Sequence, residues 1–358
     1  MTAVDARRER PAGEVGPERH ALPRGRVPLV PEPVPGEALT GYLDRVAAAN
    51  GQTREQLYDR ARVAPVLAAS YALHSSEVHG LTSVLGLSRS ELRGMTLAGY
   101  RAFPPVDVAS VRSRGGHPLL ELWPDAAAQC PACHAESPGV YPLRTINGIG
   151  FACAEHRLLH VDHCVRCGNS VRLASTRGGR VGGSRVPRPG CCEHSVGREI
   201  CGQPLADLPR IDLTEWPAAL EAQSIIDAVC AVPSAARNAA PASIPVLAAL
   251  ARWLLHPSVD VRLTGVPGHL HELICANWRT RGAADAMFCI GRRPRTCVAL
   301  VMSALAPGYL TGDAARLAAD IRAVIPRPFP GEPWYQGLPR ADAVVDAAIG
   351  LAFPPASV

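Results

Sequence analysis

The sequence contains no lysine, few aromatic residues and no long hydrophobic run. All 37 basic residues are arginine, and aromatic residues make up 5% of the 358-residue chain. No apolar stretch reaches the roughly 20 residues that a transmembrane helix needs, so we expect no membrane association. Residues 1–26 are polar and arginine-rich and lack the apolar segment of a secretory signal. The expected location is therefore cytoplasmic.

The sequence also lacks recognisable enzyme motifs. It has no P-loop, no Gly-x-Ser-x-Gly, no His-Glu-x-x-His and no dinucleotide-binding fingerprint. Its acidic residues are scattered, so no carboxylate triad of a nuclease or transposase stands out. The net charge of +5 permits nucleic-acid binding without requiring it. We therefore expect a protein without catalytic activity of its own.

Cysteine is abundant and unevenly distributed. Of the 12 cysteines, eight lie between Cys130 and Cys201, and several of them form Cys-x-x-Cys pairs. In a chain without a secretory signal, this spacing favours metal binding over disulfides. The eight cysteines therefore indicate a metal-binding module.

Two ligand pairs define a first predicted metal site. Cys130-Pro-Ala-Cys133 is followed after nineteen residues by Cys153-Ala-Glu-His156. Two residues between ligands allow both side chains of a tight knuckle to turn toward one ion. Three sulfurs and one imidazole complete a tetrahedral zinc site with no open position for a reactive water. The pattern predicts a structural zinc ion.

A second site begins at Cys164-Val-Arg-Cys167, and the glycine that follows at position 168 is expected to take a positive φ. Cys201-Gly-Gln-Pro-Leu resembles Cys167-Gly-Asn-Ser-Val, which makes Cys201 the third expected ligand. These residues predict a second structural zinc ion.

The fourth ligand of the second site is left open by the sequence. Three residues compete for it: Cys192, which we favour, Cys191 and His194. His160 and His163 flank the knuckles, and we do not expect either to be a ligand.

We expect a mainly α-helical protein that contains a small zinc-ribbon module of tandem zinc knuckles. Five segments follow from composition and pattern. They are a disordered tail (1–27), an N-terminal helical domain (28–115), the zinc module (125–210), a C-terminal helical, helix-turn-helix-like domain (215–330) and a proline-rich tail (331–358) with little regular structure.

Helical patterns and capping signals mark the N-terminal domain. The proline-dense residues 28–35 should lie extended against a helix at 36–50, and a second helix is expected at 76–85. The capping boxes Thr53-Arg-Glu-Gln56 and Ser88-Arg-Ser-Glu91 each open a further helix. A helix, a glycine turn and a capped helix outline a helix-turn-helix, although a plain helical bundle has the same pattern.

The C-terminal region has an Ala/Leu-rich helical pattern. Its clearest predicted helices are residues 244–256, 269–281, 294–305 and 312–325.

Two arginine clusters are candidate contacts for a phosphate backbone. The first lies in a glycine-rich stretch without acidic residues, which is equally compatible with a solvated insertion. It comprises Arg172, Arg177, Arg180, Arg185 and Arg188. The second brackets helix ends in the C-terminal region, where it could contact a phosphate backbone or an acidic partner. It comprises Arg279, Arg281, Arg292, Arg293 and Arg295.

Several of these segments together resemble the TniQ/TnsD family of transposition proteins. The proline-rich segment and helix of residues 31–51 resemble the family's opening, and residues 90–97 resemble the end of its N-terminal domain. The zinc-knuckle pattern from Cys130 to Gly168 resembles its metal module. The resemblance covers roughly residues 28–206. Tyr42 stands where the family usually has tryptophan.

The resemblance implies a non-catalytic adaptor that selects the target of DNA transposition. Such a protein recognises target DNA or an RNA-guided complex, recruits a AAA+ ATPase and acts on the transposase indirectly; a second copy of the chain is another implied partner. Two other readings stay open: a zinc-ribbon, helix-turn-helix transcription regulator, and an enzyme with an unrecognised site or a degenerate element remnant.

Overall fold

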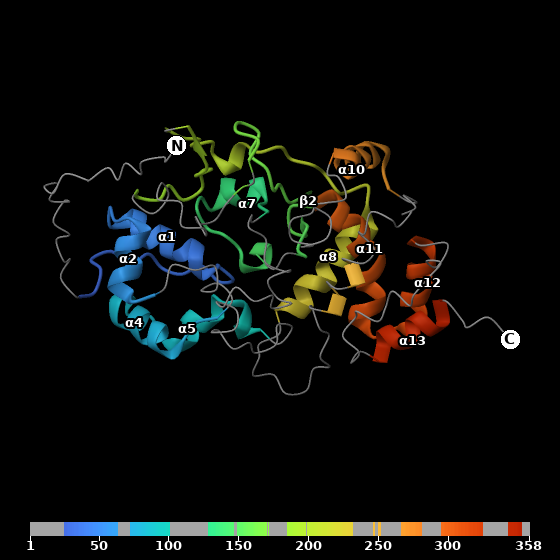
Figure 1. Cartoon of the computed structure of the whole chain (residues 1–358), viewed down its shortest axis with the longest axis horizontal. Coiled ribbons are helices and arrows are strands. Elements are labelled where there is room, and N and C mark those ends of the chain that lie inside the picture. The colour runs from blue at the N-terminus through green and yellow to red at the C-terminus, as the bar shows by residue number, and fades with distance from the viewer. Residues whose placement is uncertain are drawn as a thin grey trace, which may run out of the picture.

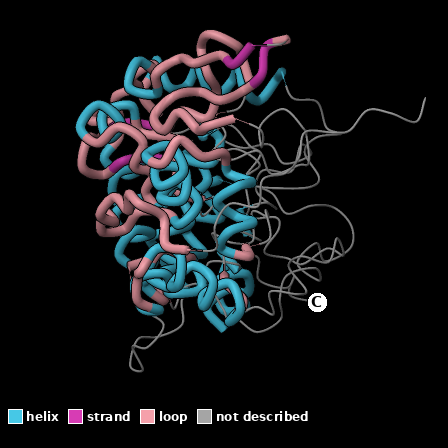
Figure 2. The backbone as a smooth tube through the Cα atoms, turned by 90° about the vertical axis from the view of Figure 1, so that its left-hand side faces the viewer, coloured by secondary structure: helices cyan, strands magenta, loops and turns pink. Residues whose placement is uncertain are grey.

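The computed structural model is mainly helical, as the sequence predicts (Figures 1 and 2). The structure describes residues 25–63, 72–100, 128–146, 149–169, 171, 185–197, 199–231, 246–247, 250–251, 266–280, 295–324 and 343–352. Within these ranges, the strands form only two short antiparallel hairpins. None of the helices described there combines the length and apolar sequence that crossing a membrane requires.

The described part of the N-terminal domain contains four α-helices, at the blue end of the chain in Figure 1. Both predicted capping boxes are present, since Thr53 and Ser88 each accept from the third backbone N–H of the following helix. Gly86 ends the third helix with φ of 76°, a conformation that favours glycine. The helices are α1 (Leu39–Ala49), α2 (Arg54–Ala61), α4 (Ser75–Leu85) and α5 (Arg89–Gly94), and the 3-10 turn η1 (Leu97–Gly99) follows.

The proline-dense segment lies extended along α1, as predicted. The Tyr42 hydroxyl donates to the Pro31 carbonyl at 2.9 Å, so the tyrosine in the family's usual tryptophan position fixes this segment. Asn50 pairs with both backbone groups of Leu29. Val27 is buried and its backbone N–H donates to Val84. Val27, the last residue of the segment expected as a tail, is therefore packed, while Gly25 and Arg26 are exposed; residues 1–24 lie outside the described residues.

The metal-binding module is built from short elements. β1 pairs with β2 through Ala152 and Leu159, and β3 pairs with β4 through Ser195 and Ile200. The elements are α7 (Pro131–Glu136), η3 (Leu143–Ile146), β1 (Ala152–Cys153), β2 (Leu158–Leu159), β3 (Ser195–Val196), β4 (Glu199–Ile200) and η4 (Leu205–Asp207).

The C-terminal region is helical, and its helices occupy the yellow-to-red end of Figure 1. Of the predicted helix 244–256, only four residues lie in the described part, and they are helical. The helices are α8 (Pro217–Cys230), α10 (Gly268–Thr280), α11 (Arg295–Thr311), α12 (Ala314–Val324) and α13 (Ala343–Ala352).

Helix α11 runs past its predicted end and contains Pro307. Proline removes one helical hydrogen bond, and burial of most of α11 outweighs that loss. Gly308 allows α12 to approach closely, because a Cβ at this position would lie 2.6 Å from the backbone nitrogen of Leu317. Tertiary packing therefore decides the length of this helix.

Helix α13 corrects the expectation for residues 331–358. The prolines of this segment flank the sequence Ala343–Ala352, which contains none. Val345, Ala348 and Ala352 are buried, and α13 packs against α12. The C-terminal segment thus contributes to the core.

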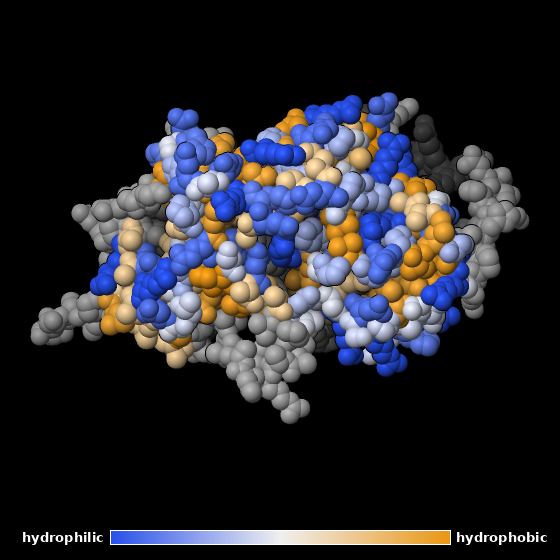
Figure 3. All heavy atoms as spheres, turned by 180° about the vertical axis from the view of Figure 1, so that it is seen from behind, coloured by the Kyte–Doolittle hydropathy of each residue, from blue (hydrophilic) through white to orange (hydrophobic). Residues whose placement is uncertain are grey.

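Among the described residues, two large hydrophobic cores support the fold, and a small one lies at the first ligand set. The N-terminal core is formed by α1, α2, α4 and α5. The larger core runs without a break from the metal module into the C-terminal helices, across the predicted boundary near residue 212. Gln223 of α8 also connects the C-terminal helices to the metal module, because its side-chain oxygen accepts hydrogen bonds from the backbone N–H groups of Phe151 and Ala152 at 2.9 and 3.0 Å. On the face opposite to that of Figure 1, polar and apolar residues are interspersed (Figure 3).

The N-terminal domain docks on the metal module through backbone hydrogen bonds. Ala38 donates to the Tyr141 carbonyl at 2.8 Å, and Leu143 donates to Gly36 at 2.7 Å. Gly41 faces the Tyr141 ring, where an added Cβ would lie 2.6 Å from a ring carbon. Glycine at position 41 therefore permits this close docking.

A buried ion network reinforces the same interface. Arg54 of α2 pairs with Asp44 of α1, with Nη2 2.9 Å from Oδ2, and also with Glu193 of the metal module. The Arg54 and Asp44 side chains are 8% and 2% exposed. Glu193 also accepts from the Arg188 backbone N–H at 2.6 Å. One arginine thus connects two helices to a loop 139 residues away.

Replacing Arg54 with Met should lower the free energy of unfolding by about 3–5 kcal/mol, because it leaves buried carboxylates without a counter-charge. Urea denaturation followed by circular dichroism measures this change. Arg89→Met is the matched control, since Arg89 is exposed at the start of α5 and should change stability by about 0.5 kcal/mol or less. Equal effects of the two substitutions would contradict a structural role for the ion network.

Candidate metal centre

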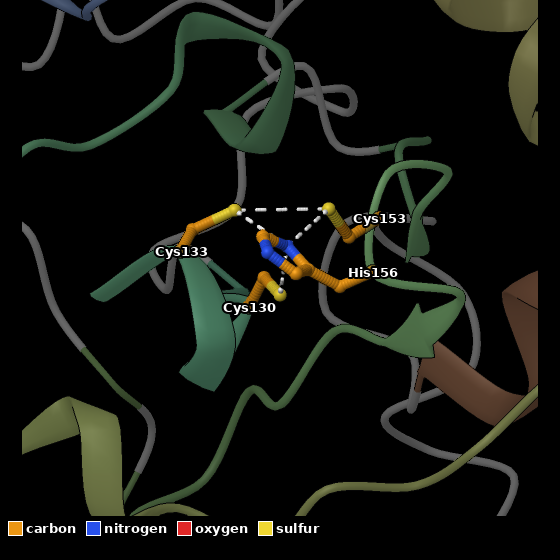
Figure 4. Close-up of side chains that lie close together, drawn as sticks. All are labelled: Cys130, Cys133, Cys153 and His156. Atoms are coloured by element: carbon orange, nitrogen blue, oxygen red, sulfur yellow. Dashed lines mark hydrogen bonds between the residues drawn. The ribbon is translucent and has the colours of Figure 1, made fainter. Parts of the chain in front are cut away.

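The first predicted ligand set converges on one point (Figure 4). Cys130 precedes α7 and Cys133 lies within it, while Cys153 ends β1 and His156 lies in the turn before β2. The Nδ1 atom of His156 lies 3.6, 3.4 and 3.4 Å from the sulfurs of Cys130, Cys133 and Cys153, in that order. The sulfurs of Cys133 and Cys153 are 3.7 Å apart.

These separations fit a tetrahedral zinc ion. With Zn–S bonds of about 2.3 Å and a Zn–N bond of about 2.0 Å, tetrahedral angles place two sulfurs about 3.8 Å apart and a sulfur and nitrogen about 3.5 Å apart. The observed distances of 3.4–3.7 Å agree. The donor set is also soft and nitrogen-containing, as zinc prefers. The residues therefore fit zinc in both geometry and chemistry.

The thiols of this cluster compete for protons. Hydrogen bonds from Cys130 and Cys133 lower the pKa of the Cys153 thiol. Hydrogen bonds with Cys130 and Cys153 raise the pKa of the Cys133 thiol in turn. A divalent cation replaces the shared protons and stabilises all three thiolates together, so metal affinity at this cluster should fall at low pH.

The second cluster contains Cys164, Cys167, Cys192 and Cys201. The sulfurs of Cys164 and Cys201 are 3.6 Å apart, and those of Cys167 and Cys192 are 3.8 Å apart. These distances again match the roughly 3.8 Å expected for two sulfurs on a tetrahedral zinc ion.

Glycine follows one cysteine in each half of this second cluster. Gly168 and Gly202 have φ of 68° and 66°, so the likeness between the segments after Cys167 and Cys201 reflects the same local backbone. In each case the turn brings the preceding cysteine toward the cluster.

The structure separates the three candidates for the fourth position. Cys192 is buried with its sulfur in the cluster. Cys191 lies outside it, and its backbone pairs with Pro204. His194 directs Nδ1 to the carbonyl of Ser195 at 3.0 Å. Consecutive residues in an extended segment point to opposite sides, which explains why Cys192 joins the cluster and Cys191 does not.

Three further histidines lie near the knuckles but outside both clusters. His134 is buried and pairs with Gln129 at 2.9 Å, and burial lowers its pKa to about 4. Burial lowers the pKa of His160 to about 3. His163 is partly exposed and lies 2.6 Å from Asp162. None of these residues contributes a nitrogen to the described clusters.

The arginine clusters are only partly placed. Of the first, Arg185 and Arg188 are exposed beside the second metal cluster, and the other three lie outside the described residues: Arg172, Arg177 and Arg180. Of the second, Arg295 is 2% exposed and donates to the Gly150 carbonyl at 2.8 Å. Arg295 is therefore a core residue of α11 rather than a surface contact, which corrects that expectation. Nothing is described of the other four side chains: Arg279, Arg281, Arg292 and Arg293.

Comparison with models of protein families finds a match in the N-terminal half of the chain. The family model TniQ matches residues 28–166. Over these residues the chain matches the TniQ family. The match spans the N-terminal domain and the first metal cluster and ends inside the second knuckle, between Cys164 and Cys167. It confirms the family resemblance over these residues. No curated protein matches the chain.

Zinc analysis of point variants tests the ligand sets. We expect two zinc ions per chain, one after Cys153→Ser and one after Cys201→Ser, because each substitution removes a ligand from a closed site. Cys191→Ser is the matched control and should keep two ions. Inductively coupled plasma mass spectrometry on purified protein gives the count. A loss of zinc in the Cys191 variant with retention after Cys192→Ser would reverse our assignment of the fourth ligand.

Proposed function

We propose that this protein is a cytoplasmic, non-catalytic accessory protein that selects the target site for transposition. The observation that carries the proposal is the TniQ match over residues 28–166, which joins the N-terminal domain to the first metal cluster. In the structure the same two parts dock through backbone hydrogen bonds that join the residues just before α1 to Tyr141 and Leu143, at the start of η3. The matched region is thus a packed unit.

The metal clusters support a structural rather than catalytic role. Each offers four protein ligands, which fill the coordination sphere of zinc and leave no position for a reactive water. Zinc bound at these clusters would hold short hairpins in place and supply folding energy. The proposed function therefore rests on binding surfaces.

We further propose that these surfaces bind two kinds of partner. One is target DNA or an RNA-guided targeting complex, and the other is a AAA+ transposition ATPase that in turn engages the transposase. The N-terminal domain and the metal module would provide the contact surfaces, and helical segments would contact DNA or a second copy of the chain. A chain of 358 residues without a recognised catalytic motif is consistent with such an adaptor.

Co-purification from the native host tests the adaptor function. A AAA+ ATPase or an integrase-type transposase should remain bound to the wild-type chain after nuclease treatment, as mass spectrometry would show. The same capture should fail with Cys153→Ser, which disrupts the first metal cluster, and persist with Cys191→Ser, which leaves both clusters intact. Recovery of DNA from a single promoter, without an ATPase, would instead support a transcription regulator.

The regulator remains a second candidate because α4, the Gly86 turn and the capped α5 have the outline of a helix-turn-helix. The size of α5 argues against it. Six residues span about 9 Å, which is short for a recognition helix in a major groove. The TniQ match therefore outweighs this outline.

The first arginine cluster is proposed to contact the DNA backbone. Replacing all five arginines (Arg172, Arg177, Arg180, Arg185 and Arg188) with Gln should weaken DNA binding and flatten its dependence on salt. Each lost phosphate contact reduces the slope of log K against log [salt] by about 0.9. Fluorescence anisotropy with duplex DNA at several salt concentrations measures the slope. An unchanged slope would make the loop a solvated insertion.

A further inference from the structure

Two charged side chains, Glu136 and Arg144, contact ligands of the first metal cluster directly. The imidazole of His156 directs Nδ1 toward the three sulfurs, and its Nε2 lies 2.9 Å from Oε1 of Glu136. A metal ion at the cluster needs the lone pair of Nδ1, so the ring proton must reside on Nε2. The Glu136 carboxylate is placed to accept that proton in a hydrogen bond.

Glu136 is the last residue of α7, three residues after the ligand Cys133. The same short helix therefore carries a metal ligand and the carboxylate that faces another ligand. The His156 and Glu136 side chains are 16% and 64% exposed. A carboxylate in this position fixes the ring orientation of a ligating histidine and strengthens its donor nitrogen.

Arg144 is the second charged residue that contacts a ligand of the first cluster. It lies in η3, and its Nη2 donates to the Cys153 sulfur at 3.7 Å. Three thiolates, a neutral imidazole and a divalent ion carry a net charge of about −1 by formal counting. The guanidinium offsets part of this charge, and a thiolate that accepts a hydrogen bond is a weaker nucleophile.

We propose that Glu136 and Arg144 are positioning residues of the first metal centre. Glu136 holds His156 in the tautomer that presents Nδ1 to the ion, and Arg144 protects the Cys153 thiolate from electrophiles. The inference rests on zinc occupying this cluster. The two residues lie outside the ligand set and act on different ligands. Glu136 strengthens the nitrogen donor of His156, and Arg144 weakens the nucleophilicity of the Cys153 sulfur.

Zinc competition with a chromogenic chelator tests Glu136. In the full-length chain, Glu136→Ala should weaken zinc binding at the first site about 10–100-fold, the usual cost of losing such a partner. Glu136→Gln retains an acceptor oxygen and should fall between wild type and the alanine variant. Glu155→Gln is the matched control, because Glu155 belongs to the same acidic group around His156 but has no described hydrogen bond to the ring. The second site should keep its wild-type affinity in all variants.

Selective alkylation tests Arg144. In the zinc-loaded chain, Arg144→Gln should make Cys153 react with iodoacetamide several-fold faster, while Cys130 and Cys133 keep their rates. Peptide mass spectrometry resolves the three cysteines, and Arg144→Lys should restore part of the protection. Uniform acceleration of all three cysteines would indicate a loosened site and overturn the assigned role.

The outcomes also separate this inference from the zinc assignment. A wild-type chain that binds no zinc at the first cluster removes the basis for both. Zinc bound with unchanged affinity in Glu136→Ala, and an unchanged Cys153 rate in Arg144→Gln, overturns the positioning roles alone. Expected changes in both experiments support them.

Discussion

The structure brings eight candidate metal-ligand side chains together at two points. In the part of the metal module that the structure describes, the strands are two residues long and the helices are short, so local hydrogen bonds contribute little to its stability. The sulfur and nitrogen separations match the dimensions of tetrahedral zinc in both clusters. Two ions would therefore fix the loops that the rest of the chain packs against. The first cluster lies beside a small core of its own, and the second belongs to the large core shared with the C-terminal helices.

Besides the backbone hydrogen bonds, one side chain next to a cluster cysteine links this constraint to the N-terminal domain. Glu193 directly follows the ligand Cys192, and its carboxylate pairs with Arg54 of α2. The position of the second knuckle therefore determines where the counter-charge of Arg54 lies. The Arg54 guanidinium is itself committed to Asp44 within the N-terminal core. Folding of the second knuckle and docking of the N-terminal domain are in this way energetically coupled, because a misplaced Glu193 would leave a buried arginine with only one of its two acidic partners.

Local patterns predicted much of this architecture, and long-range packing supplied what they missed. Cys-x-x-Cys spacing and capping boxes depend on contacts within a few residues, so the ligand pairs and the starts of α2 and α5 were predictable. The continuation of α11 through Pro307 depends on burial against α12, and no local signal reports it. Arg295 looked like a surface cation, since only the fold shows that it reaches the Gly150 carbonyl inside the core. The contact of Arg54 with Glu193 spans 139 residues, so hydrophobic periodicity could not predict it either.

The second cluster lies across the end of the matched region. The TniQ region ends between two ligands of the second cluster, so the remaining ligands, Cys167, Cys192 and Cys201, come from sequence beyond the match. The core that contains this cluster continues into α8, α11 and α12. The matched region and the C-terminal helices therefore share one hydrophobic core, which also contains the cysteines of the second cluster.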